Sequence, residues 1–152
     1  MMPVDSQLKS GIVTGQQIVE WLEGELENAL GKDPAKRFGG WFVRFSGLQV
    51  TFTIANATGS RVQLVKVQSE PLVRDKTYSV LGCEREGDTE NMVCRIPKVA
   101  DARRRDATVH AVLTEYLAAH SPVAPVVEGR ATATDAPADL LSQVEGTPYR
   151  FR

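Results

Sequence analysis

Histidine is scarce in this sequence, with only His110 and His120 among its 152 residues. Metal-assisted hydrolysis needs several His, Asp or Asn ligands around one or two ions, and these two histidines show no repeated ligand spacing. The sequence therefore argues against a self-contained metal-dependent hydrolase. Packing is the favoured role for His110, and His120 is expected to lie at the C-terminal end of a helix, where cations are favourable.

The motifs of nucleophilic and phosphate chemistry are also missing. There is no glycine-rich phosphate loop with Lys and Ser or Thr, no Gly-x-Ser-x-Gly elbow and no Cys-x-x-Cys pair. Nucleophilic catalysis thus has no good candidate residue, and no cofactor is expected in this chain.

Long apolar runs and an excess of one charge are absent as well. The apolar runs are far shorter than the roughly 20 residues that cross a bilayer, so no membrane partner is expected. The first five residues lack a charged leader with an apolar stretch behind it, so no signal peptide is expected there. A net charge of -1 gives no general attraction to polyanions, which argues against nucleic acid as a main partner.

The composition is that of an ordinary folded domain, with 42% hydrophobic and 24% charged residues. A chain of this length can bury a sizeable core, and no repeat of 20 to 50 residues suggests a solenoid. We predict a single domain over residues 1–152, with its core in about 3–134 and an irregular tail in 135–152.

A first helix is predicted over residues 14–30. The hydroxyl of Thr14 can cap the first turn while Gln17 completes a capping box, and Gly31 can end the helix in a left-handed conformation. One face is apolar, and the glutamates of the helix fall mostly elsewhere. The apolar positions are Ile18, Leu22, Leu26, Ala29 and Leu30.

Alternating apolar and polar residues predict several strands of an antiparallel sheet. Gly47 interrupts the first of them, and residues 57–60 form a turn. The predicted strands are residues 42–45, 48–54, 61–67, 77–81 and 126–132.

A second helix is predicted to begin at Asp106 as its cap and to end before Pro122. Its apolar stripe should cover one face of the sheet. The stripe consists of Val109, Val112, Leu113, Tyr116 and Leu117.

Three short motifs resemble a known family: residues 45–48 (FSGL), 75–81 (DKTYSVL) and 127–130 (VEGR). They look like the C-terminal domain of the 5′-nucleotidase family, and the resemblance runs over about residues 3–134. Residues 39–48 lean toward the thiosulfohydrolase branch of sulfur oxidation. The resemblance implies an α+β fold with four layers, helix, sheet, sheet and helix, and mainly antiparallel sheets.

The resemblance also implies a function. In the family, an N-terminal metallophosphoesterase domain, absent from this chain, carries divalent metals and the hydrolytic chemistry. The C-terminal domain closes over the substrate. The chain is thus expected to be a substrate-binding and closure domain of a phosphoric ester hydrolase, inactive when isolated. Its expected partners are that metallophosphoesterase domain and a nucleotide-like or sulfur-containing anion, in a periplasmic or extracellular parent protein.

The family's nucleotide-binding members stack the base between two aromatic rings. Here Val4 and Arg85 stand where those rings would be, and Gly87-Asp88 remains of the second segment. Arg85 can stack on a base or bind an anion such as sulfate, and Asp88 can accept hydrogen bonds from a sugar or hold the loop. The alternative is a solvated charged loop without a ligand.

Three further features have a structural and a functional interpretation. Arg44 lies among apolar neighbours, so it either pairs with a carboxylate, the favoured role, or binds substrate. The basic residues 103–105 are expected to be solvated. Trp41, Phe42, Phe45 and Phe52 are expected to fill the core rather than form a stacking platform.

The two cysteines, Cys83 and Cys94, flank a polar stretch, residues 84–91. If strand 78–81 turns back into residues 92–96, both lie at the base of this loop, where a disulfide is predicted. Two reduced cysteines in the core are the alternative.

A second function class stays open, a structural or partner-docking module without its own ligand pocket. Compared with the family pattern, the chain also begins after the first strand. One sheet edge or helix face is therefore expected to be uncovered, and self-association is expected from it.

Overall fold

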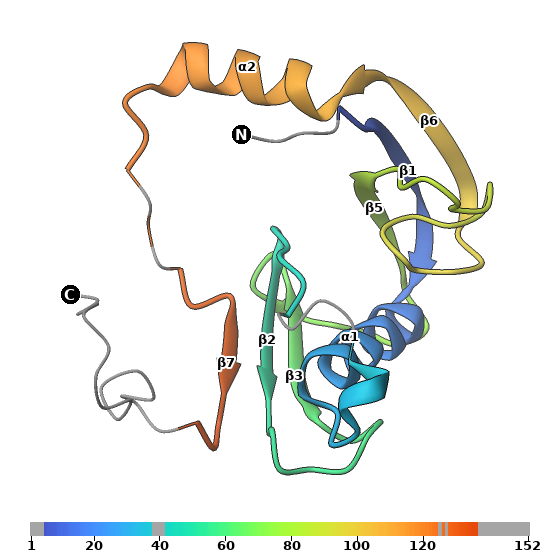
Figure 1. Ribbon diagram of the computed structural model, residues 1–152, viewed down its shortest axis with the longest axis vertical. Coiled ribbons are helices and arrows are strands. Elements are labelled where there is room, and N and C mark those ends of the chain that lie inside the picture. Colours follow the sequence, from blue (N-terminus) through green and yellow to red (C-terminus); the bar gives the residue numbers. More distant parts are fainter. Residues whose placement is uncertain (1–4, 38–41, 125, 127, 137–152) are drawn as a thin grey trace.

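A computed structural model describes residues 5–37, 42–124, 126 and 128–136 (Figure 1). Within these residues the fold consists of two sheets and two helices, with one 3₁₀ turn at Pro34–Lys36. The helices are α1 (Gly15–Leu30) and α2 (Val109–His120). The strands are β1 (Gln7–Thr14), β2 (Leu48–Phe52), β3 (Val62–Val67), β4 (Glu70–Pro71), β5 (Thr77–Cys83), β6 (Ala100–Thr108) and β7 (Ala131–Ala133).

The first sheet has the strand order β5-β1-β6, and the second has the order β4-β3-β2-β7. All neighbouring strands are antiparallel except β2 and β7, which pair in parallel at Val50 with Ala131. The mixed helix and sheet fold with mainly antiparallel sheets is therefore confirmed.

Helix α1 packs against both sheets (Figure 1). The side chains of Ile18, Leu22 and Leu26 are buried, as the apolar spacing predicts. They join residues of β1, of both long strands of the second sheet and of the turns before β6. The other members of this buried cluster are Val13, Val50, Phe52, Val65, Val93, Ile96 and Val99.

The start of α1 agrees with the prediction, and the backbone conformation at its end does not. Thr14 and Gln17 form the predicted capping box. Gly31 has a φ of -51°, so the left-handed ending is wrong. Glycine is needed there for space instead, because an added Cβ would lie 2.7 Å from the carbonyl oxygen of Glu27.

Two glutamates of α1 lie inside the fold, contrary to the prediction of a mostly separate acidic face. Glu23 accepts hydrogen bonds from the backbone N–H of Val62 at 2.7 Å and of Gly59 at 3.1 Å. Glu25 is buried as well. Side-chain oxygens of α1 thereby fix the turn between β2 and β3 to the helix.

The predicted strand at residues 42–45 is wrong, because this segment is irregular. Phe42 packs there with Phe45 and Phe52, at ring-centroid distances of 5.8 and 5.6 Å. The core role expected for these rings is therefore met without strand pairing, while Trp41 lies outside the described residues. In place of the strand predicted at 126–132, the structure has the shorter strand β7, Ala131–Ala133.

Helix α2 departs most from expectation. Its cap is Thr108 rather than Asp106, because β6 pairs with β1 up to Thr108 and includes residues 103–105. The helix stands apart from both sheets (Figure 1) and covers no sheet face among the described residues. Val112, Leu113, Tyr116 and Leu117, here called the α2 stripe, are each 39–48% exposed.

The histidines of α2 also lie at its surface. The ring of His120 stacks on Tyr116 at 4.3 Å, in the last turn as expected. The ring of His110 is 3.9 Å from the carboxylate of Asp5, rather than in a core. Neither helix in the described part of the chain has the length and apolar character needed to cross a bilayer.

Candidate functional site

The loop after β5 carries two of the predicted site residues, Arg85 and Asp88. The backbone N–H of Glu84 donates to the carbonyl of Gln7 at 2.8 Å, which ties the start of the loop to the beginning of β1. Gly87 has a φ of +85°, a conformation that favours glycine. Asp88 closes the turn, because its carboxylate accepts from the N–H of Arg85 at 3.1 Å.

A polar depression of about 300 Å³ lies at this loop, here called the loop depression. It brings Arg85 and Asp88 together with Arg104 of β6, which sequence analysis treated as merely solvated. Its lining residues are Gln7, Glu84, Arg85, Glu86, Gly87, Asp88 and Arg104.

Glu84 organises the base of the loop depression. It accepts from Arg104 Nε at 2.7 Å and lies 3.5 Å from Lys9 Nζ. The hydrogen bond from Arg104 is the main reason why the pKa of the Glu84 carboxyl is lowered, and the same bond raises the pKa of Arg104. Lys9 is 3% exposed and also donates to the carbonyl of Thr89.

Sequence reasoning missed Lys9 and Glu84. The alternation of β1 places Lys9 on the same strand face as Gly11 and Val13, and all three residues are buried. A lysine on that face needs a carboxylate partner. No local pattern identifies the partner as Glu84, which is 75 residues away in the chain.

The charges that line the loop depression nearly balance. Arg85 and Arg104 face three carboxylates, those of Glu84, Glu86 and Asp88. Such a surface does not concentrate anions in general. It offers acceptors for hydroxyl groups next to two guanidinium groups, which suits a sugar-like group beside one anionic or planar group.

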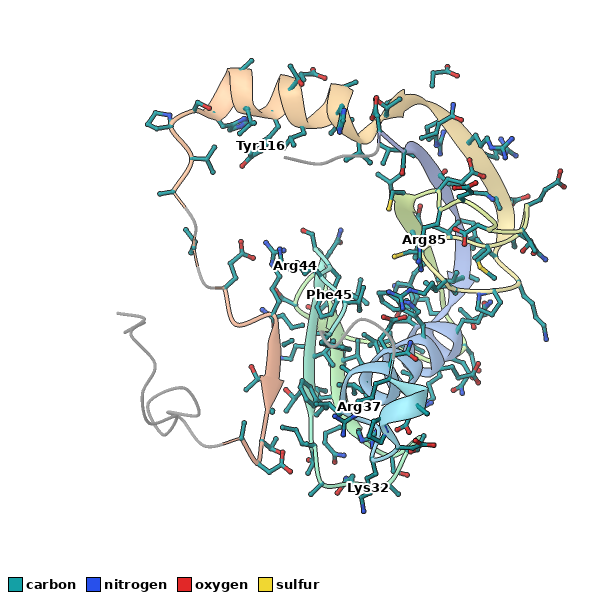
Figure 2. The ribbon with its side chains drawn as sticks, in the orientation of Figure 1. Lys32, Arg37, Arg44, Phe45, Arg85 and Tyr116 are labelled. Atoms are coloured by element: carbon teal, nitrogen blue, oxygen red, sulfur yellow. The ribbon has the colours of Figure 1, made fainter. Side chains whose placement is uncertain are left out.

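Arg44, the third predicted site residue, does not line the loop depression. Figure 2 shows Arg44 and Arg85 on different parts of the molecule. Arg44 borders a separate cavity of about 450 Å³ between the sheets. It makes no hydrogen bond or salt bridge to the described residues, so the favoured carboxylate partner is not found among them.

The disulfide predicted between Cys83 and Cys94 is not present, because both are free thiols. Strand β5 does not turn back into residues 92–96; it pairs with β1, and Val93 and Ile96 form an isolated bridge. Cys94 abuts Gly82, where an added Cβ would lie 3.0 Å from its own Cβ. Since adjacent strand residues point to opposite faces, Cys83 faces away from Cys94.

The described residues contain no group of three or more His, Cys, Asp or Glu side chains that could hold a metal ion. This part of the chain therefore offers no set of ligands suited to divalent metals, which by resemblance belong to the metallophosphoesterase domain. Val4, the position of the first family aromatic, lies outside the described residues, as does most of the predicted tail at 135–152.

Comparison with known proteins identifies the family. The model of the 5′-nucleotidase, C-terminal domain, matches residues 1–83, more than half of the chain. The chain belongs to this family. No curated protein matched the sequence.

Solved structures agree with this 5′-nucleotidase C-terminal fold. The sulfate thiohydrolase SoxB of Thermus thermophilus is 22% identical with a TM-score of 0.66, over 88% of this chain and 23% of that one. A 5′-nucleotidase precursor, also from Thermus thermophilus, is 26% identical with a TM-score of 0.63, over 87% of this chain and 26% of that one.

A putative 5′-nucleotidase from Staphylococcus aureus is 16% identical with a TM-score of 0.65, over 87% of this chain and 28% of that one. The present chain thus spans about a quarter of the length of these proteins. The SoxB and Staphylococcus aureus likenesses concern the fold alone.

Proposed function

We propose that this chain is the substrate-binding and closure domain of a two-domain, metal-dependent hydrolase. The observation that carries the proposal is the loop depression, which brings Arg85 together with Asp88 and Arg104. Its loop is also the segment that, by resemblance, presents a base-stacking aromatic in nucleotide-binding relatives. Membership of the 5′-nucleotidase C-terminal family supports the two-domain role.

The residues of this chain would bind and orient the substrate. The planar guanidinium of Arg85 stacks on a base or pairs with an anionic group, and Glu86 accepts hydrogen bonds from hydroxyl groups. Asp88 keeps the loop in shape through its bond to the Arg85 N–H. Divalent metals in the metallophosphoesterase domain would supply the activation of water for hydrolysis.

A nucleotide-like or sulfur-containing anion is the substrate class that we propose. The solved relatives include a protein named as a 5′-nucleotidase precursor and one named as a sulfate thiohydrolase. The nearly balanced charges favour a ligand with hydroxyl groups and one negative group, which places the nucleotide-like class first. A periplasmic or extracellular parent protein is part of the same proposal, by resemblance to the family.

Titration of the full chain with adenosine monophosphate, adenosine and thiosulfate, followed by amide chemical shifts, tests the proposal. We expect saturable shifts at residues 84–88 with one of these ligands, and loss of binding in Arg85→Ala. Lys32→Ala is the matched control, because Lys32 is an exposed cation at the far end of the molecule (Figure 2). Equal binding by the Arg85→Ala variant, or no shift with any ligand, would contradict a binding role.

The catalytic part of the proposal has its own assay. The chain with added divalent metals should not hydrolyse nucleoside phosphates, cyclic nucleotides or sugar nucleotides. Turnover that persists through purification and is abolished by a substitution within this chain would overturn the closure role and make the chain an enzyme by itself.

A second candidate function is a docking module that stabilises a catalytic partner. The exposed α2 stripe favours it, because four large apolar side chains lie on a helix that covers no sheet face in the described structure. Tight binding to a metallophosphoesterase domain without any small-molecule shift at residues 84–88 would support this candidate over the first.

A further inference from the structure

Strand β5 lies at one edge of the first sheet, and its outer side is not paired within the described structure. The N–H of Glu84 donates to the carbonyl of Gln7, so residues of β5 with even numbers direct their N–H and carbonyl groups toward β1. The backbone groups of Ser79 and Leu81 therefore point away from β1. They have no hydrogen-bond partner in the described part of the chain. This unpaired side of Thr77–Cys83 is here called the β5 edge.

The two edges of this sheet differ in their protection against a further strand. The other edge strand, β6, carries three arginines at residues 103–105, and its pairing with β1 has two register shifts. Charges and bulges on an edge strand discourage pairing with another strand. Strand β5 has no charged side chain, and its register with β1 is unbroken over seven residues. The β5 edge is therefore the one that an added strand can join.

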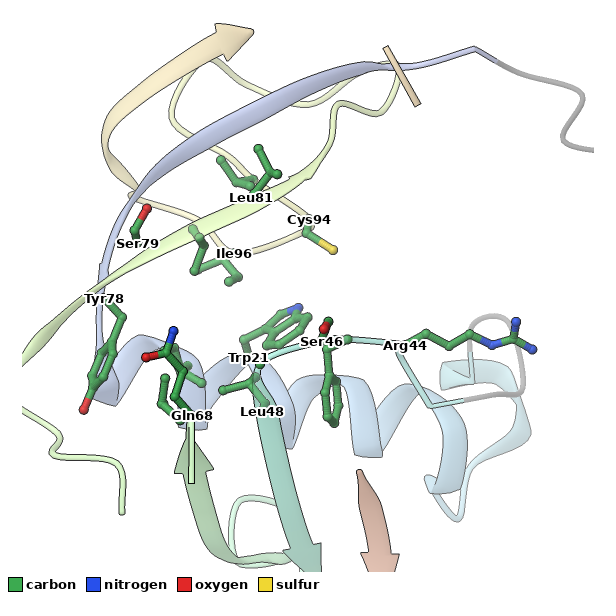
Figure 3. Close-up of a pocket in the computed structure, with 16 residues that line it drawn as sticks. Trp21, Arg44, Ser46, Leu48, Gln68, Tyr78, Ser79, Leu81, Cys94 and Ile96 are labelled. Carbon is green, nitrogen blue, oxygen red and sulfur yellow. The ribbon is translucent and has the colours of Figure 1, made fainter. Parts of the chain in front are cut away.

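The cavity of about 450 Å³ lies along the β5 edge and is separate from the loop depression (Figure 3). Four consecutive residues of β5, Tyr78 to Leu81, line it, so it borders both faces of the strand and the edge between them. Residues 44–48 also line it. The space therefore suits one added strand better than a second copy, whose β5 would bring its own β1 at a distance of about 4.8 Å.

One side of this space is apolar. Val80 packs against the buried cluster, and the cavity lining includes members of that cluster. A strand that pairs with β5 places every second side chain on the same face as Val80, where apolar groups would be removed from water. The remaining side chains would lie beside Ser79 and Leu81, which are exposed. The apolar lining residues are Ile18, Leu48, Val67, Val93 and Ile96.

Arg44 adds a positive charge at one end of the cavity. Figure 3 shows Arg44 and Cys94 at this end and Tyr78 at the other. Cys94 abuts Gly82, so this is the end at which β5 finishes. Arg44 is exposed and makes no hydrogen bond or salt bridge to the described residues. A carboxylate at this end of the added strand would complement it.

We propose that the β5 edge binds one extended segment of a partner protein. The segment runs antiparallel to β5, as the other strands of this sheet do with their neighbours. It has apolar side chains at alternate positions, no charge in its middle, and a carboxylate at the end next to Arg44. Its backbone supplies the missing partners of Ser79 and Leu81. This site goes beyond the proposed substrate binding and does not depend on Arg85.

Amide hydrogen exchange of the full chain, followed in ¹H–¹⁵N spectra, is the first measurement. Exchange should be faster at Ser79 and Leu81 than at Val80 between them, whose N–H is bonded to β1. The peptide acetyl-Asp-Thr-Val-Thr-Val-Thr-amide is the probe, because its threonines stand opposite Leu81, Ser79 and Thr77 in the proposed register. We expect saturable shifts of the Ser79 and Leu81 amides, and slower exchange at both.

Two N-methylated peptides are matched partners of this probe. The threonines opposite Leu81 and Ser79 direct their own N–H groups toward β5, so N-methylation of these two removes two hydrogen bonds. We expect it to weaken binding about tenfold or more. The amides of the two valines point away from β5, and N-methylation there should leave binding close to that of the parent peptide.

The charge at the end of the segment has its own cycle. Arg44→Gln should bind the parent peptide about three- to tenfold more weakly, and exchanging the peptide's aspartate for asparagine should then have little further effect. Unchanged binding in Arg44→Gln would overturn the carboxylate end of the proposal. Leu117→Gln, the control for unspecific binding to the α2 stripe, should bind like the native chain.

Three results would overturn the proposal as a whole. The first is the absence of shifts at Ser79 and Leu81 at every peptide concentration. The second is equal binding of the two N-methylated peptides. The third is protection of the Ser79 and Leu81 amides that rises with the concentration of the chain alone, because a second copy would then occupy the β5 edge.

Discussion

Arg95 Nη1 lies 3.2 Å from Glu25 Oε1, in an ion pair whose carboxylate side chain is only 4% exposed. Burial raises the pKa of Glu25 above its ordinary value of 4.5, and the nearby charges of Arg95 and Arg85 oppose this only in part. The attraction of Arg95 therefore offsets only part of the free-energy cost of burying the ionised Glu25 carboxylate.

Glu25→Gln should change how stability depends on pH. Between 4.5 and the raised pKa, the folded chain binds more protons at this site than the unfolded chain. The contribution of Glu25 to the free energy of unfolding therefore decreases as the pH rises through this interval. Urea unfolding at several pH values should show native stability falling relative to Glu25→Gln. Glu20→Gln, on the exposed side of α1, is the control. If the stabilities of the native chain and of Glu25→Gln changed in parallel with pH, the raised pKa of Glu25 would be contradicted.

Two glycine-to-alanine substitutions should have opposite signs. A Cβ at Gly11 would lie 2.3 Å from Val99 Cγ1 and 2.9 Å from the Ala100 carbonyl oxygen. Gly11→Ala should thus lower the free energy of unfolding by about 1 to 3 kcal/mol or more. A Cβ at Gly24, inside α1, meets nothing within 4 Å, so Gly24→Ala should raise it by about 0.5 to 1 kcal/mol. Equal effects in thermal unfolding would be inconsistent with this packing.

The two thiols should differ in reactivity. Cys83 is exposed, whereas burial raises the pKa of the Cys94 thiol, and the charges of Cys83 and Glu25 raise it further. Because the thiolate is the nucleophile, iodoacetamide near neutral pH should alkylate Cys83 first. Peptide mass spectrometry over time gives the order. Faster labelling of Cys94 would contradict its lower accessibility, and an intact mass two hydrogens lower without reductant would contradict the two free thiols.

The α2 stripe should promote self-association. Exposed apolar patches of this kind commonly mark interaction surfaces. We expect the sedimentation coefficient of the native chain to rise with concentration, and the double variant Leu113→Gln, Leu117→Gln to remove that rise. Lys32→Ala serves as the control. A native chain that stays monomeric at every concentration would show that this helix face does not bind a second copy.

Helix α1 could be predicted almost to the residue because its signals are local. The Thr14–Gln17 capping box and the spacing of Ile18, Leu22 and Leu26 need no knowledge of the rest of the chain. The segment at 42–45 has an equally apolar pattern, yet a strand also needs a neighbour to pair with. Phe42 packs on Phe52 instead, and no local signal distinguishes the two outcomes.

The same limit applies to the candidate site. The loop that carries Arg85 and Asp88 could be predicted from its Gly-Asp pair, by resemblance to the family. Their neighbour Arg104 comes from β6, and it joins them only through the pairing of β1 with β6. The cavity that Arg44 borders depends in turn on the distance between the two sheets, which no periodicity in the sequence specifies.

Strand β7 pairs with β2 over only three residues, at one edge of the second sheet. Val50 N–H donates to the carbonyl of Arg130 at 2.8 Å, and Thr134 N–H donates to that of Phe52 at 2.8 Å. These three-residue pairings join parts of the chain that are about 80 residues apart, with all of α2 between them. The second sheet should therefore open from its β7 side first, exchanging the Val50 and Thr134 amide hydrogens with solvent well before those shared by β2 and β3. In that opened state β2 becomes an edge strand, able to receive an extended segment of another chain in the place of β7.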